Sequence, residues 1–258
     1  MNNYVRTARC SENQAIQIIT IDRPPRNAMT LECYKQLLGA LEEINRDQTV
    51  ECAILTGAGD KSFVAGGDLN EHAQLDAESA QFRTSLIRRV FNTIRELRVP
   101  VIAAVNGYAL GGGLALMASC DITVASENAK FSLPEVKVGI MGGTRHLRRL
   151  VPEQTVRWMA LTGEMISADF FFRLGAIQAL VPAEELMQAA TKVALDICKN
   201  SPAATSLMKE ALNVTEHMPL QEGYHVECFA TSVMKSMPDG QEAVNAMLEK
   251  RSPNFKRT

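Results

Sequence analysis

The chain has 258 residues, the length of one large domain or of one domain with an appendage. Its 27 basic and 29 acidic residues leave a net charge of −2, which argues against a surface built to bind nucleic acid. No apolar run approaches the ~20 residues that cross a bilayer, so the 46% hydrophobic residues predict a globular core and no membrane partner.

The first half of the chain alternates between strand patterns and helix patterns. Thr30 is a predicted helix cap, and the continuous apolar run Val101–Val105 predicts a strand buried on both faces. The predicted strands are Ala15–Ile21, Val50–Gly57, Val101–Val105 and Asp121–Ala125, and the predicted helices are Leu31–Ile44, Ala77–Leu97 and Gly113–Ala118. Strands that alternate with helices indicate an α/β fold with a parallel sheet.

The second half is predicted to be nearly all helical. Asn200-Ser201-Pro202 is the best candidate boundary, which divides the chain into a core of residues 1–200 and a helical region of residues 201–258. The predicted helices are Glu153–Leu161, Ser167–Leu174, Ala183–Lys199, Pro202–Asn213, Pro219–Met234 and Asp239–Lys250, with a short strand at Ala176–Val181. Amphipathic helices of this kind suit packing on the core or on another subunit.

The cysteines and histidines do not form a recognisable metal site. The six cysteines contain no CxxC pair, and the four histidines contain no HExxH. We therefore expect reduced thiols, no metal and a cytoplasmic location, with a bacterial cytosol preferred to an organelle matrix.

Two glycine-centred turns, Gly66-Gly67 and Gly111-Gly112-Gly113, carry the first chemical signal. A helix that begins near Gly112 leaves its first N–H groups unpaired, and its dipole favours a negative oxygen there. Glycine leaves no Cβ to block a ligand. The alternative is a pair of tight turns that only pack a helix on a strand. Neither a Walker A loop nor a GxGxxG fingerprint is present.

Glu135 carries the second signal. It follows Pro134 and is flanked by the apolar residues Phe131, Leu133 and Val136. Partial burial there would raise the pKa of the carboxyl group toward a value useful for acid–base catalysis. The alternative is an exposed loop glutamate.

The order of these segments resembles the crotonase (enoyl-CoA hydratase/isomerase) superfamily over nearly the whole chain. The segments that carry the resemblance are Phe63-Val64-Ala65-Gly66-Gly67-Asp68, Asn106-Gly107-Tyr108-Ala109-Leu110-Gly111-Gly112-Gly113, Cys120-Asp121-Ile122, Phe131-Ser132-Leu133-Pro134-Glu135, Gly142-Gly143-Thr144, Leu161-Thr162-Gly163, Ala176-Ile177 and residues 248–255. The resemblance implies a spiral of ββα units with a helical C-terminal trimerisation region, assembled as a homotrimer or a dimer of trimers.

The same resemblance implies the site. The substrate is an acyl-CoA thioester, so coenzyme A enters as part of the substrate and no cofactor is tightly bound. The N–H groups of Gly67 and Gly112 form an oxyanion hole, and Glu135 is the catalytic acid/base. Asp121 is expected to be structural. The implied substrate-binding residues are Arg26, Ala28, Ala65, Gly66, Asp68, His72, Gly111 and Lys250.

Some of these residues have a more specific expectation. Arg26, Ala28 and Ala65 are expected along coenzyme A, and Lys250 near its nucleotide end, from a neighbouring subunit. Asp68 is also a predicted cap of the helix that follows it.

Two departures from the family pattern bear on the reaction. Ala115 stands where two-glutamate hydratases have their second glutamate, which favours double-bond isomerisation over hydration. The Gly139–Thr144 loop is shorter than in many relatives, so the shape of the acyl group can differ. Residues near it and elsewhere that could shape the pocket are Leu75, Met141 and Trp158.

Other reactions stay open. They are hydration or dehydration through a second group other than glutamate, hydratase-lyase chemistry, decarboxylation and thioester hydrolysis. His72 is the candidate second group, and its alternative is a pocket-lining or surface histidine. For Arg145 and His146 a solvated or structural role is preferred.

A non-enzymatic role is the contrasting hypothesis. One crotonase relative binds AU-rich RNA through a basic helix, and five arginines crowd the predicted helix Ala77–Leu97 here. They do not share one helical face and the chain has no basic excess, so we expect no nucleic-acid partner. A second alternative is an acyl-CoA-binding paralogue without turnover.

Overall fold

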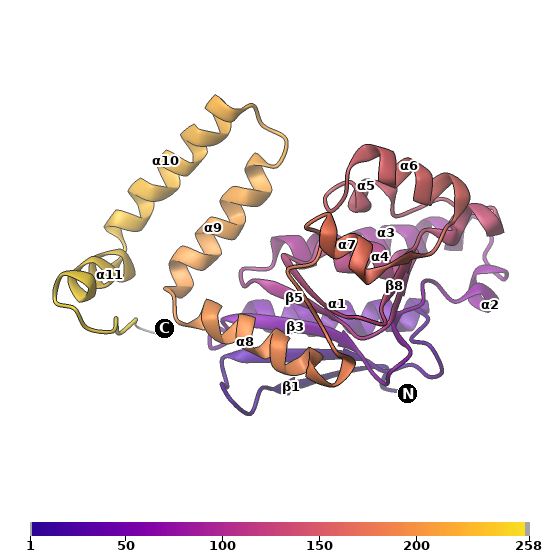
Figure 1. Ribbon diagram of the computed structural model, residues 1–258, viewed down its shortest axis with the longest axis horizontal. Coiled ribbons are helices and arrows are strands. Elements are labelled where there is room, and N and C mark those ends of the chain that lie inside the picture. Colours follow the sequence, from indigo (N-terminus) through magenta and orange to yellow (C-terminus); the bar gives the residue numbers. More distant parts are fainter. Residues whose placement is uncertain (1, 256–258) are drawn as a thin grey trace.

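The structure, a computed structural model that describes residues 2–255, is built on two β-sheets (Figure 1). The six strands of the larger sheet are β1 (Val5–Arg9), β2 (Ile16–Ile21), β3 (Cys52–Gly57), β5 (Val101–Val105), β7 (Ile122–Ser126) and β10 (Ala179–Val181). The four strands of the smaller sheet are β4 (Ser62–Val64), β6 (Tyr108–Leu110), β8 (Lys130–Ser132) and β9 (Ile166–Ser167).

Helices connect and cover these sheets. They are α1 (Leu31–Arg46), α2 (Leu69–His72), α3 (Ala77–Glu96), α4 (Gly112–Ser119), α5 (Thr144–Leu147), α6 (Glu153–Thr162), α7 (Ala168–Arg173), α8 (Leu186–Cys198), α9 (Pro202–Thr215), α10 (Leu220–Ser236) and α11 (Pro238–Leu248), with 3₁₀ turns η1 (Pro134–Val138) and η2 (Ala183–Glu185). Within residues 2–255, none of the helices combines the length and apolar character that a membrane span requires.

Successive turns of the chain give one strand to each sheet and then a helix. The larger sheet runs β1-β2-β3-β5-β7-β10, parallel except for the β1–β2 pair, and the smaller runs β4-β6-β8-β9, parallel except for β8–β9. Thus β3 is followed by β4, β5 by β6 and β7 by β8. This is the predicted spiral of ββα units with a helical C-terminal region.

The predicted long strands are confirmed, whereas the short ones were missed. The predicted strand Ala176–Val181 is paired only over Ala179–Val181. The smaller sheet was not predicted at all, because its strands have two or three residues each. Such segments are too short to display the period-two alternation by which a strand is recognised.

The larger sheet is buried on both faces. Alternate residues of β3 face opposite ways, so Ala53 and Leu55 join the main core while Cys52 and Ile54 join a second apolar cluster. Helix α8 covers that second cluster and lies in front of the sheet in Figure 1. The continuous apolar strands therefore have the two-sided burial expected of a parallel sheet.

Cysteines are mostly interior residues. Cys10, Cys33, Cys52 and Cys120 are buried free thiols, and Cys228 on α10 is an exposed one. Burial raises the pKa of the Cys52 and Cys120 thiols, which keeps both protonated at neutral pH.

A buried lysine docks α9 on the core. Lys209 is 6% exposed, and its ammonium group donates to the carbonyls of Ile94 and Val99 at 3.0 Å each. It also pairs with Asp121 at 2.7 Å, and Asp121 accepts from the N–H of Val101, also at 2.7 Å. Asp121 therefore has the structural role expected of it.

Replacing Lys209 with methionine is expected to lower the free energy of unfolding by about 3–5 kcal/mol, because Asp121 loses its buried cation. Urea denaturation measures this difference. The matched control is Lys199→Met, since the Lys199–Asp196 pair has a 73% exposed lysine and its loss should leave the midpoint unchanged. Equal midpoints for all three proteins would contradict the docking role of Lys209.

The last two helices stand away from the sheets. Figure 1 shows α10 and α11 at the opposite end of the molecule from α2. Large apolar side chains on them are exposed, among them Leu220 at 87%, Phe229 at 72% and Met247 at 83%. A monomer rarely leaves so many apolar side chains exposed on one element.

Candidate active site

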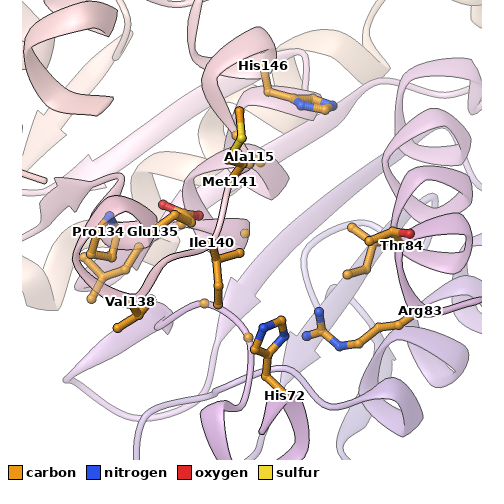
Figure 2. A pocket seen from close by; sticks show the side chains of 18 of the residues that line it. His72, Arg83, Thr84, Ala115, Pro134, Glu135, Val138, Ile140, Met141 and His146 are labelled. Carbon is orange, nitrogen blue, oxygen red and sulfur yellow. The ribbon is translucent and has the colours of Figure 1, made fainter. Parts of the chain in front are cut away.

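A cavity of about 480 Å³ lies between α3, α4 and η1 (Figure 2). It gathers most of the predicted site residues although they come from distant parts of the sequence. The predicted site residues that line it are Ala65, Gly66, Gly67, His72, Gly111, Gly112 and Glu135.

The first glycine turn is held by a short bridge to the segment before α1. The N–H of Met29 donates to the carbonyl of Gly66 at 2.8 Å, and the N–H of Asp68 donates to the carbonyl of Met29 at 3.0 Å. Gly67 lies between these two bonds, and its own N–H has no hydrogen-bond partner among residues 2–255. That donor is available to a ligand.

The second glycine turn is the N-terminus of α4. The first helical bond runs from the N–H of Ala115 to the carbonyl of Gly111 at 3.0 Å, so the N–H of Gly112 has no partner within the described chain. Gly111 has φ 53° and ψ −116°, a conformation that strongly favours glycine. Two unpaired N–H groups on one cavity wall can bind one negative oxygen.

Close packing fixes the position of α4. A Cβ on Gly113 would lie 2.0 Å from the carbonyl oxygen of Val64, so only glycine lets the helix approach β4 this closely. A Cβ on Gly111 would lie 2.5 Å from Oε1 of Glu135. The carboxylate is therefore in contact with the turn that supplies the N–H donors.

Glu135 is set in the first turn of η1, directly after Pro134. Its side chain points into the cavity beside Ala115 (Figure 2), and its Oε2 is buried with no hydrogen-bond partner in the described residues. Burial raises the pKa of this carboxyl group, as predicted from its apolar neighbours. A buried carboxylate with an unused oxygen can take a proton from a bound ligand.

Among the described residues, the wall next to Glu135 offers no second carboxylate. Ala115 is 2% exposed and lines the cavity with its methyl group. A Cβ built on Gly143 would be 3.9 Å from the Cβ of Ala115, so the shortened loop closes over this point.

Two histidines line the cavity, His72 on α2 and His146 on α5. Burial, together with the positive charges of Arg149, Arg95 and Arg145, lowers the pKa of His146, so its ring is neutral at neutral pH. The ring packs edge-on against Phe91 with centroids 5.0 Å apart. The sequence favoured a solvated or structural role for His146, and its position in the cavity lining was not predicted.

Sequence reasoning also missed Tyr34 and Arg83, which line the same cavity. A usable signal existed, because Arg83 shares the helical face of Ile87, Val90 and Ile94, the apolar stripe of α3. An arginine in a stripe of that kind is either paired or functional.

Some predicted contributors lie elsewhere. Asp68 does not line the cavity; it caps α2 by accepting from the N–H of Glu71 at 3.0 Å, as predicted, and pairs with Arg23 at 2.8 Å. Arg26 and Ala28 also lie outside the cavity. Lys250 is exposed and follows α11, at the far end of the molecule from α2, so it cannot reach this chain's own cavity (Figure 1).

Of the three residues that could shape the pocket, only some lie in the cavity lining. Met141 lines the cavity, whereas Leu75 and Trp158 do not. Across residues 2–255, no three His, Cys, Asp or Glu side chains are grouped to hold a metal ion.

Comparison with known proteins assigns the chain and its fold to one family. Residues 11–258 match the family model described as Enoyl-CoA hydratase/isomerase. The chain belongs to this family. It is 38% identical over 240 residues to the short-chain-enoyl-CoA hydratase of Clostridium acetobutylicum, covering 92% of each chain. It is 37% identical over 255 residues to the carnitinyl-CoA dehydratase of Salmonella typhi, covering 95% of this chain and 97% of that one.

Solved structures of the enoyl-CoA hydratase family agree. The crystal structure of an enoyl-CoA hydratase from Bacillus anthracis superposes with a TM-score of 0.94 at 32% identity, covering 99% of this chain and all of that one. The chain therefore has the crotonase fold and is an enzyme of the enoyl-CoA hydratase family.

Proposed function

We propose that the protein moves a proton on an enoyl-CoA thioester, and that it favours the isomerisation of a 3-enoyl-CoA to the 2-enoyl-CoA. One observation carries this proposal. Glu135 is the carboxylate in the cavity, and Ala115 puts a methyl group where a second carboxylate would be needed to activate water. A single base is sufficient for a proton that leaves one carbon and returns to another.

In the proposed reaction, the thioester oxygen accepts hydrogen bonds from the N–H groups of Gly67 and Gly112. Glu135 removes a proton from C2, the electron pair spreads into a dienolate, and the negative charge is concentrated on the thioester oxygen. The protonated Glu135 then returns its proton to C4, so the double bond moves and no atom is gained or lost. One such N–H donor typically supplies about 3–4 kcal/mol of transition-state stabilisation.

Hydration or dehydration is the second candidate. It is supported by the names of relatives, which include hydratases and a dehydratase. Within the site, His72 and His146 are the two ring groups that can orient a water in place of the missing glutamate. Glu135 would then act on that water or on C2.

The coenzyme A part is proposed to lie along Ala65, at the wall of the acyl cavity, and along Arg26 and Ala28, outside it. Lys250 would approach its nucleotide end only from a neighbouring copy. The exposed apolar side chains of α10 and α11 support assembly as a homotrimer or a dimer of trimers. We expect a trimer or hexamer mass in light scattering at micromolar concentration, and a monomeric mass would contradict this.

Product analysis separates the two reactions. The protein is incubated with 3-butenoyl-CoA and, separately, with crotonyl-CoA, and the products are resolved by mass and retention. Conversion of 3-butenoyl-CoA to crotonyl-CoA without 3-hydroxybutyryl-CoA supports isomerisation. Rapid formation of 3-hydroxybutyryl-CoA supports hydration, and His146 and His72 then become the residues to replace.

The rate should depend on the ionisation of Glu135. A general base must be deprotonated in the free enzyme, so kcat/KM is expected to fall as pH drops through the pKa of Glu135. Burial raises that pKa above its ordinary value of 4.5, so the fall begins at a higher pH than for an exposed glutamate. Circular dichroism over the same pH range is the control for unfolding. A flat profile down to the ordinary carboxyl pKa would contradict the assignment.

A further inference from the structure

The floor of the cavity holds a phenol whose hydroxyl group is unused. Tyr34 lines the cavity and is 2% exposed, and its Oη makes no hydrogen bond to another residue within the described part of the chain. The Oη is 3.0 Å from the point that a Cβ on Gly112 would occupy. A hydroxyl group in the wall of a cavity that makes no bond within the protein is free to donate to a ligand bound there.

Arg83 lies beside it with donors that are also poorly used. Its side chain is buried, and its Nε is 3.3 Å from Oε2 of Glu71 while its Nη2 is 3.4 Å from the carbonyl of Met29. Charge-assisted bonds are usually about 2.7–2.9 Å long. Its Nη1 has no partner among residues 2–255. Figure 2 shows the side chain directed toward the cavity.

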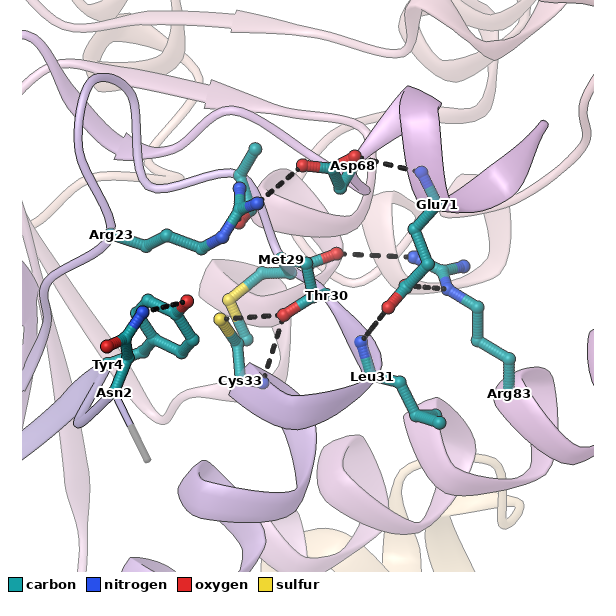
Figure 3. Close-up of polar contacts among 11 residues, drawn as sticks. Asn2, Tyr4, Arg23, Met29, Thr30, Leu31, Cys33, Asp68, Glu71 and Arg83 are labelled. Carbon is teal, nitrogen blue, oxygen red and sulfur yellow. Dashed lines mark hydrogen bonds and ion pairs between the residues drawn. The ribbon is translucent and has the colours of Figure 1, made fainter. Parts of the chain in front are cut away.

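The role of Glu71 shows why Arg83 is not simply the partner of a carboxylate. Both carboxylate oxygens of Glu71 accept from the N–H of Leu31, at 2.9 and 3.0 Å, and so hold the start of α1 (Figure 3). The guanidinium group of Arg83 contacts only one of these oxygens, and the rest of the group extends beyond Glu71 toward Gly67. Its Nη2 is 2.7 Å from the point that a Cβ on Gly67 would occupy, and its Cζ is 5.8 Å from the centroid of the Tyr34 ring.

The cationic side chains that line the cavity outnumber the acidic ones, even though Glu71 outside the lining pairs with Arg83. Arg83, Arg88 and Lys137 line it, against Glu135 as the carboxylate of the lining. Burial raises the pKa of Tyr34 to about 12, so the phenol is a donor at neutral pH. A thioester oxygen is a single atom that the two glycine N–H groups can satisfy, whereas a carboxylate has two oxygens that need further donors.

We propose that Tyr34 and Arg83 form a subsite for a carboxylate carried by the acyl group, so that the preferred ligands are CoA monothioesters of dicarboxylic acids. Tyr34 Oη donates to one carboxylate oxygen and Arg83 to the other. This inference rests on the proposed function for its enoyl form, but the binding of saturated ligands tests it without any turnover.

The experiment measures binding by calorimetry for butyryl-CoA, succinyl-CoA, glutaryl-CoA and 5-methylhexanoyl-CoA. Glutaryl-CoA differs from butyryl-CoA by one terminal carboxylate, and 5-methylhexanoyl-CoA replaces the carboxylate oxygens with methyl groups. Wild type is expected to bind succinyl-CoA or glutaryl-CoA about 10- to 100-fold more tightly than either neutral ligand. No preference for either diacid ligand would overturn the proposal.

Variants locate the preference. Tyr34→Phe removes only a hydroxyl group without a partner, so it should fold normally and lose about tenfold of the preference. Arg83→Met should abolish the preference, and Arg83→Lys should restore part of it. Tyr224→Phe, on α10, is the control and should change nothing.

The ligands whose binding weakens in Tyr34→Phe show whether Tyr34 and Arg83 bind a terminal carboxylate or the thioester end. Binding of butyryl-CoA should be the same in wild type and Tyr34→Phe. If Tyr34→Phe weakens butyryl-CoA and the diacid ligands equally, the phenol serves the thioester end and the carboxylate subsite is wrong. If the proposed isomerisation fails while the diacid preference holds, the proposed reaction is at fault and the subsite stands.

Discussion

Replacing Glu135 with glutamine is expected to lower kcat by about 100- to 10,000-fold, the usual contribution of a general base. Glutamine has nearly the same shape but cannot accept the proton from C2. The oxyanion donors on Gly67 and Gly112 are untouched, so KM should change little. Exchange of the C2 proton of a bound enoyl-CoA into deuterated water, followed by mass spectrometry, measures the lost step directly.

The same Glu135→Gln substitution should not lower the free energy of unfolding. Oε2 of Glu135 is buried without a partner, so ionisation of this group opposes folding, and a neutral amide removes that penalty. We expect the Glu135→Gln protein to be at least as resistant to urea as wild type. Glu127→Gln, an exposed position after β7, is the control for both measurements. Activity of Glu135→Gln within tenfold of wild type would remove Glu135 from the mechanism.

Replacing Gly112 with alanine is expected to lower kcat by up to about 100- to 1,000-fold, because the backbone N–H stays but the new Cβ would keep the thioester oxygen from reaching it, which has the effect of losing one oxyanion donor. The new Cβ would lie 3.0 Å from Oη of Tyr34, on the side from which a ligand approaches. Steady-state kinetics with 3-butenoyl-CoA measures the loss. The double variant Gly112→Ala/Tyr34→Phe removes the Oη contact and should recover part of the rate.

Gly39→Ala is the matched control. Gly39 lies inside α1, and a Cβ there meets nothing within 4 Å. Alanine should therefore stabilise the protein by about 0.5–1 kcal/mol and leave the rate unchanged. A Gly112→Ala enzyme as active as Gly39→Ala would show that the N-terminus of α4 does not bind the thioester oxygen.

The sequence was sufficient where a signal is local. Thr30 caps α1 through its side chain, and Asp68 caps α2, because a cap is defined by its own helix. The β-branched run Ile16–Ile21 is long enough to show its alternation. The two glycine turns and Glu135 were recognised because they occur in a familiar order along the chain.

The remaining part of the site depends on contacts between distant segments. Tyr34 and Arg83 are 49 positions apart on α1 and α3, and nothing in either helix alone indicates that both reach one cavity. Asp68 caps α2 and pairs with Arg23 outside the cavity lining, so its expected contact with the substrate stays a prediction. Lys250 can be placed near a substrate only in an assembly, which no single-chain pattern encodes.

Because some cysteines are exposed and others are buried, their reaction with a thiol reagent can report on the opening of the folded core. A thiol reagent meets Cys228 at once on the surface of α10, whereas Cys33 and Cys120 are closed to it until the core around them opens. The rate of reaction at Cys228 therefore reports how accessible the surface of α10 is, and it should fall if another subunit covers that surface. The slow reaction of the interior thiols reports how often the core unfolds enough to expose them. One time course of alkylation therefore measures both the accessibility of α10 and the opening of the core, without an added label.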